Sequence, residues 1–315
     1  MARSEKGTEY IKRPAPVNDE PFTSNPNKEY IRRAFDEPVV AQWFQRLGRP
    51  LKYLGLPAWQ MLDIVAWQRM LGRFTGIERA ENQQHLMFLN ANVEDLEHRL
   101  YALYGNFDDI LIRGRDLYGK TPDWPYDLIN LDYFGGFLYS DLSRPRAFKK
   151  LIENQGAYSR SFLLIVTQHL RDKDTAKEKD KFLSDLGERL KGGVLDKKLH
   201  AQIDKIIAWY RDADLPDAAR QGLYMNCFLR EFGESAQFKV FCRPGVVYLG
   251  TGKASMIHFV TDFWFEPNIA HRATSDQSVL EIINLGLLQA ENEALRDRSF
   301  SQPRLQLAGS KRANR

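Results

Sequence analysis

The chain has 315 residues and a mass of 36.5 kDa, which is enough for one large domain or two modest ones with a buried core. It is 43% hydrophobic and 27% charged, a globular composition that excludes a wholly disordered chain. No run of about 18 uncharged apolar residues occurs, so no membrane-spanning helix is expected. No apolar signal core follows Met1 either. We therefore expect a cytoplasmic protein with no membrane partner.

The net charge of +4 is concentrated at the chain ends. Residues 1–34 carry a net charge of +2 and residues 296–315 carry +5, whereas the body between them carries −3. A basic tail can contact a phosphate backbone without reading its sequence, so nucleic acid is a predicted partner. The alternative, and the more common case, is a solvated tail that keeps the chain soluble.

Short apolar runs alternate with helical patterns along the first half of the body. Strands are expected at 52–57, 73–78, 109–113, 126–132 and 160–169. Helices are expected between them, at 59–71, 83–104 and 146–154. Strands that are apolar on both faces are typical of a parallel sheet, so we predict an α/β fold whose sheet is covered by helices on both sides.

The second half of the body has a different pattern. Only helical periodicity is found from 173 to 234. Strands return at 238–242 and 256–265, and the glycines between them predict an antiparallel pair. A last helix is expected at 278–295.

The segment 126–136, with the sequence YDLINLDYFGG, carries the most specific motif. It resembles the fourth-strand motif of nucleic-acid and tRNA N-methyltransferases, in which an acid or Asn ends the strand before proline, an aromatic residue and often glycine. Tyr133 stands here where proline is usual. Together with the strand–helix units and the terminal strand pair, the motif resembles the Rossmann-like class I methyltransferases that bind S-adenosylmethionine.

The resemblance implies a mostly parallel methyltransferase sheet with an antiparallel terminal strand pair and an all-helical insertion. It divides the chain into an extended polar arm, a Rossmann-like core, a helical insertion, a strand pair with a helix that complete the core, and a basic tail. These segments are 1–27, 28–170, 171–236, 237–295 and 296–315.

The resemblance also implies roles for individual residues. Asp132, at the end of its strand, would accept a hydrogen bond from a substrate amine, and the catalytic site would include Tyr133 and Phe134 as a surface on which a flat base stacks. Glu78 would bind the ribose hydroxyls of the cofactor, and Asp116 would lie near its adenine. Each acid has an alternative role as a helix cap or turn former.

The first strand departs from the family pattern. The family has a G-x-G-x-G loop there, whereas this chain has GLPAW at 55–59. Only Gly55 would let the backbone approach a cofactor closely, and Pro57 lacks an N–H donor. Two functions stay open: a methyltransferase that uses S-adenosylmethionine and acts on nucleic acid, or a catalytically degenerate relative that serves as a binding or assembly subunit for a protein partner. The histidines show no metal-ligand spacing, so no metal site is expected.

Overall fold

The computed structural model describes residues 26–58, 60–133, 143–169, 217–243, 245–249 and 255–267, together with Gln306–Leu307 and single positions between 184 and 208. Its strands are β1 (Leu51–Gly55), β2 (Leu71–Glu78), β3 (Leu100–Tyr104), β4 (Leu128–Asp132), β5 (Phe162–His169), β6 (Phe238–Cys242), β7 (Val246–Leu249), β8 (Ser255–Phe265) and β9 (Gln306–Leu307). Its helices are α1 (Pro26–Tyr30), the π-helical η1 (Ile31–Asp36), α2 (Glu37–Leu47), α3 (Leu62–Trp67), α4 (Glu81–Val93), the 3-10 turn η2 (Glu97–Arg99), α5 (Phe107–Arg113), α6 (Ser143–Ala157) and α9 (Asp217–Ser235).

The described strands form one mixed sheet in the order β3-β2-β1-β4-β5-β8-β7-β9. The first five of these strands in the sheet are parallel, and β8 then runs antiparallel to β5. Strands β6 and β7 pair with successive parts of β8, both antiparallel to it. The predicted fold class, a Rossmann-like sheet with antiparallel terminal strands, is confirmed.

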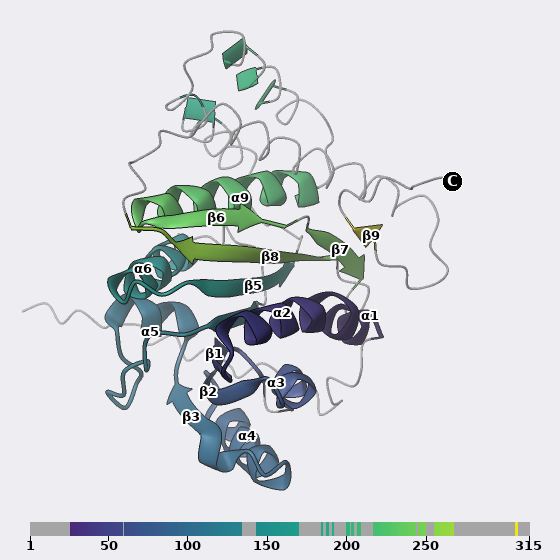
Figure 1. The fold of residues 1–315 in the computed structure, drawn as a ribbon, viewed down its shortest axis with the longest axis vertical. Helices are drawn as coiled ribbons and strands as arrows, with labels where there is room; N and C mark the ends of the chain where they lie inside the picture. Colours follow the sequence, from purple (N-terminus) through teal and green to yellow (C-terminus); the bar gives the residue numbers. More distant parts are fainter. Residues whose placement is uncertain are drawn as a thin grey trace, which may run out of the picture.

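Helices cover both faces of this sheet, as Figure 1 shows. On one face, α2, α3 and α4 pack on a buried cluster that includes Trp43, Trp67 and Phe74. On the other face, α5, α6 and α9 pack on a second cluster that includes Phe148 and Phe162. Side chains of β4 and β5 enter both clusters, which explains why these strands read as continuous apolar runs.

The sequence-based prediction was wrong at the third strand. The helix expected over 83–104 ends at Val93, and the strand expected at 109–113 is helix α5. The third strand is instead Leu100–Tyr104, at the edge of the described sheet. Asn106 accepts hydrogen bonds from the N–H groups of Asp108 and Asp109 and so begins α5, while Gly114, with φ of 72°, ends it.

Several further expectations concern the ends of the chain. The expected polar arm, 1–27, lies outside the described residues except for Pro26 and Asn27, which begin α1. The helix expected at 278–295 lies outside them as well, as does most of the basic tail. Among the residues that are described, none of the helices has the length and apolar character needed to cross a membrane.

Candidate functional site

The strand order reverses between β1 and β4, and a pocket opens beside this point at the carboxyl ends of the strands. This is the position at which open α/β sheets bind their ligands. The pocket has a volume of about 160 Å³. Its lining comes from the loop after β1, from α3, from the ends of β4 and β5, from β7 and β8, and from the N-terminal helices α1 and η1.

Asp63, on α3, is a buried carboxylate of this pocket, only 8% exposed. Its Oδ2 accepts a short hydrogen bond from the hydroxyl of Tyr53 and a second one, of 2.7 Å, from Nδ2 of Asn130. Burial and then the neighbouring Asp63 carboxylate raise the pKa of Tyr53 well above its usual value, so this phenol stays protonated and keeps donating. These two donors fix the orientation of the Asp63 carboxylate.

The loop between β1 and α3 adopts an unusual backbone conformation. Ala58 and Met61 have φ values of 50° and 52°, in the left-handed region that non-glycine residues rarely adopt. The loop is held in place because the N–H of Leu56 donates to the carbonyl of Asn130 at 3.1 Å and the N–H of Met61 donates to the carbonyl of Pro57 at 3.2 Å. Strained conformations of this kind concentrate at functional sites.

The N-terminal helices form one wall of the pocket. Lys28 makes a short ion pair with Asp132, and Arg32 makes one with Glu29 on the same helical segment. Ile31 packs against buried side chains of β7 and β8 and so anchors this wall to the sheet. The charge of Asp132 is therefore compensated by a cation from the N-terminal helices.

His258, on β8, lines the pocket beside the N-terminal helices. Its Nε2 lies 2.7 Å from Oδ1 of Asp36, and its Nδ1 lies 2.8 Å from Oγ1 of Thr167. Tyr248 also lines the pocket, and burial, followed by the nearby carboxylates of Asp132 and Asp36, raises its pKa well above the usual value. This side of the pocket is therefore made of polar groups that already have partners.

Of the three predicted acids, the structure places one in the lining of the pocket. Asp132 lines it, whereas Glu78 and Asp116 do not. Glu78 ends β2, and its Oε1 accepts hydrogen bonds from the N–H groups of Arg79 and Ala80, at 2.8 and 3.1 Å, before α4 begins. Strands β2, β1 and β4 are parallel neighbours, so Glu78 and Asp132 lie at the same carboxyl end of the sheet with one strand between them.

Asp116 follows helix α5 and not a strand, which corrects the placement expected from the sequence. It is buried, and its carboxylate accepts three backbone hydrogen bonds. The donors are the N–H groups of Tyr104, Tyr118 and Lys120, at 3.1, 2.8 and 2.8 Å. These bonds shape the turn that follows α5 and tie it to the end of β3.

The aromatic pair after β4 is only partly described. Tyr133 is 6% exposed, donates a 2.9 Å hydrogen bond to Asp108 and lies with its ring centroid 3.9 Å from the guanidinium carbon of Arg144. Burial, and then the Asp108 carboxylate, raises its pKa well above the usual value. Its ring is therefore packed inside the protein. Phe134 lies outside the described residues.

Gly55 ends β1, where close backbone approach to a cofactor was expected. A Cβ built on it would lie 2.2 Å from the hydroxyl oxygen of Tyr53 and 2.6 Å from the carbonyl oxygen of Asn130. The space beside this glycine is therefore occupied by the protein's own groups. The requirement for glycine follows from this packing.

Sequence reasoning missed Asp63, Asn130, Lys28 and His258 as pocket residues. Asn130 lay within the fourth-strand motif, and its polar side chain in an otherwise apolar strand was a usable signal. Asp63 has the position of an ordinary acid in the first turn of a helix, and Lys28 lies just after a segment predicted to be extended. No local pattern separates these two from solvated charges.

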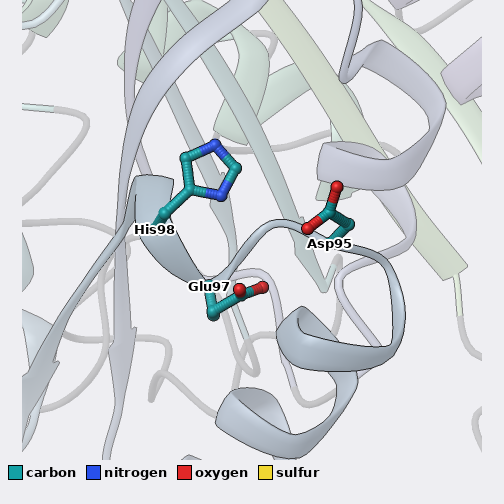
Figure 2. Close-up of side chains that lie close together, drawn as sticks. All are labelled: Asp95, Glu97 and His98. Atoms are coloured by element: carbon teal, nitrogen blue, oxygen red, sulfur yellow. The ribbon is translucent and has the colours of Figure 1, made fainter.

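A second group of polar side chains lies away from the pocket. Asp95, Glu97 and His98 lie close together between α4 and β3, as Figure 2 shows. Their possible ligand atoms all lie within 4.8 Å of one another. All three are exposed, with Glu97 and His98 on η2 and Asp95 just before it. Exposed acidic groups of this kind are common without an ion, so we assign them no function.

No family model matches the sequence, and a search of curated proteins gives no match. Among solved structures, the chain is similar to the O-methyltransferase TomG from Streptomyces achromogenes in complex with SAM, with 15% identity, 76% of this chain and 90% of that chain covered, and a TM-score of 0.39. It is also similar to an O-methyltransferase from Bacillus cereus in complex with SAH (14% identity, 78% and 94% covered, TM-score 0.37). A SAM-dependent methyltransferase from Agrobacterium tumefaciens is a third (10% identity, 74% and 62% covered, TM-score 0.38). The fold assignment rests on the strand order given above.

Proposed function

We propose that this chain is a methyltransferase-like protein that binds S-adenosylmethionine at the carboxyl ends of β1, β2 and β4. The observation that carries this proposal is the carboxylate-lined pocket at the point where the strand order reverses, where Asp63 and Asp132 lie beside the ends of β1 and β4. S-adenosylmethionine supplies an electrophilic methyl group on a sulfonium, so the protein's task is mainly to position the cofactor and the acceptor.

The size of the pocket and the charged groups that line it decide which part of the cofactor it would hold. A volume of about 160 Å³ is smaller than the roughly 300 Å³ at which drug-sized ligand pockets begin, so the pocket would enclose only one end of the cofactor. Carboxylates line the pocket, which suits the ammonium group of the cofactor's amino-acid end. The adenosyl end would extend past Pro57 toward the end of β2, where Oε2 of Glu78 makes no hydrogen bond to any described residue.

In this arrangement, Glu78 would bind the ribose hydroxyls and Asp132 would face the acceptor. Lys28 now pairs with Asp132, so an acceptor amine would have to displace that ammonium group. Nucleic acid remains the acceptor predicted from the fourth-strand motif and the basic tail. Deleting residues 296–315 should weaken nucleic-acid binding and reduce its salt dependence, because fewer phosphates are neutralised. Unchanged nucleic-acid binding after the deletion would mean that this segment is a solvated tail.

A second function is a binding or assembly subunit without turnover. It is favoured by the loop after β1, which lacks the glycines of the family motif, and by Tyr53, which occupies the space beside Gly55. Under this interpretation the polar network of Tyr53, Asp63 and Asn130 stabilises the loop and serves no ligand.

Calorimetric titration with S-adenosylmethionine separates the two functions. The wild-type chain should bind the cofactor, and Glu78→Gln should weaken binding by about 10- to 150-fold because a charged hydrogen-bond acceptor is lost. Glu81→Gln, in the exposed first turn of α4, is the matched control and should bind as wild type does. Asp132→Asn should retain more of the cofactor affinity and lose transfer of a labelled methyl group. The absence of cofactor binding at millimolar concentration would favour the binding subunit.

A further inference from the structure

Each charged side chain that lines the pocket contacts a side chain that carries, or can carry, the opposite charge, with one exception. Lys28 pairs with Asp132, Arg32 pairs with Glu29, and Asp36 contacts His258. Asp63 forms no ion pair with any residue that the structure describes, although it is more than nine-tenths buried. A buried carboxylate without a counter-charge is costly, so proteins pair such groups with a cation.

The hydrogen bonds of Asp63 show which of its oxygens is available. Both donors, the hydroxyl of Tyr53 and Nδ2 of Asn130, bind to Oδ2. Among the described residues, Oδ1 has no hydrogen-bond partner, and the side chain lines the pocket. The carboxylate is therefore held in a fixed orientation, with one oxygen available to a ligand.

We infer that Asp63 is the counter-ion for an ammonium group of the ligand, and that the Tyr53–Asp63–Asn130 network holds this carboxylate ready to receive it. An ammonium group has three donors and fits one carboxylate oxygen with little demand on geometry. A divalent metal would need several oxygen ligands, and among the described residues no three metal-ligating side chains meet in this pocket. A ligand that carries only negative charge is disfavoured, because Lys28 and Arg32 already have carboxylate partners.

The ammonium group has two sources within the proposed reaction, and the identity of the ligand rests on the proposed function. One source is the amino-acid end of S-adenosylmethionine, and the other is an amine acceptor. Three probes separate these sources in calorimetric titrations of the full chain: S-adenosylmethionine, 5′-methylthioadenosine, which lacks the amino-acid end, and spermidine, an amine without the adenosyl group.

The test compares the wild-type chain with Asp63→Asn, which removes the charge and preserves the shape. Asp123→Asn is the matched control, because Asp123 pairs with Lys52 and Arg73 and does not line the pocket. If the cofactor supplies the ammonium group, Asp63→Asn should weaken S-adenosylmethionine binding by about 10- to 150-fold and leave methylthioadenosine binding unchanged. If an amine acceptor supplies it, spermidine binding should fall instead. Equal affinities of wild type and Asp63→Asn for all three probes would overturn the inference.

A measurement on the wild-type chain covers the case in which Asp63→Asn does not fold. Methylammonium chloride should compete with whichever cationic probe binds, whereas sodium chloride at the same ionic strength should compete much less. Equal competition by the two salts, or no binding of either cationic probe, would show that the inference is wrong. Failure of the proposed function has a different signature, since S-adenosylmethionine and methylthioadenosine would then both fail to bind while spermidine still binds and is displaced by methylammonium.

Discussion

Gly55 and Gly76 are aligned partners on the parallel strands β1 and β2, and they provide a matched pair for substitution by alanine. A Cβ on Gly55 would lie 2.2 Å from the Tyr53 hydroxyl and 2.6 Å from the backbone carbonyl of Asn130. A Cβ on Gly76 would lie 2.9 Å from the sulfur of Met87, the flexible part of a long side chain. Backbone cannot move away as easily as a methionine can, so Gly55→Ala should cost more.

The magnitude follows from the groups that must move. Overpacking costs typically about 1–3 kcal/mol. If the Tyr53 phenol also shifts away from Asp63, a hydrogen bond to a charged group is lost, which contributes roughly 1.5–3 kcal/mol more. We therefore expect Gly55→Ala to lower the free energy of unfolding by about 3 kcal/mol or more. Gly76→Ala should cost less than about 1 kcal/mol, because the methionine adjusts and alanine lowers the entropy of the unfolded chain.

Urea unfolding followed by tryptophan fluorescence measures both changes, and thermal unfolding checks them. At roughly 2–4 °C per kcal/mol for a domain of 150–250 residues, Gly55→Ala should lower the melting temperature by about 6–12 °C. Equal losses of stability in the two variants would contradict this prediction. A Gly55→Ala variant that is as stable as wild type and loses only cofactor affinity would also contradict it, because the space beside Gly55 would then belong to the ligand.

Two further predictions concern stability away from the pocket. Asn106→Ala should lower the free energy of unfolding by about 1 kcal/mol, because the N–H groups of the first turn of α5 lose their acceptor. Asn106→Asp keeps an acceptor and should retain most of that stability. Equal losses of the two variants in urea unfolding would contradict this. Burial raises the pKa of Glu234 above its usual value of 4.5 despite the ion pair with Arg230, so its ionised form lowers the stability of the folded chain. Glu234→Gln should therefore be more stable than wild type at pH 7, and the difference should disappear as the pH falls below about 4.5; a difference that grows toward low pH would contradict this.

The sheet was predictable where strands are buried on both faces. The strands β4 and β5 were found because their side chains form short, continuous apolar runs. The strands β1, β2, β6 and β8 were found because proline, glycine or charged residues mark where they begin or end. The third strand was missed because Leu96, Leu100 and Leu103 continue the helical period of α4, although the helix ends at Val93. The N-cap Asn106 and the C-terminal Gly114 were the signals that identify the next segment as a helix.

The candidate site was less predictable than the sheet. Asp132 could be found because it ends a strand and belongs to a motif. Asp63 could not, since its position in the first turn of a helix is common for an acid, and only the three-dimensional arrangement brings Tyr53 and Asn130 to one of its oxygens. Lys28 reaches the pocket through a contact 104 residues away in sequence, which no local pattern encodes.

The proposed cofactor site is best tested by an experimental structure of the full chain with S-adenosylmethionine bound. We expect the ribose to lie against Glu78, the ammonium group to lie within hydrogen-bond distance of Asp63, and the methyl group to face Asp132. Cofactor bound elsewhere on the molecule, or an unchanged pocket without cofactor at saturating concentration, would contradict this expectation.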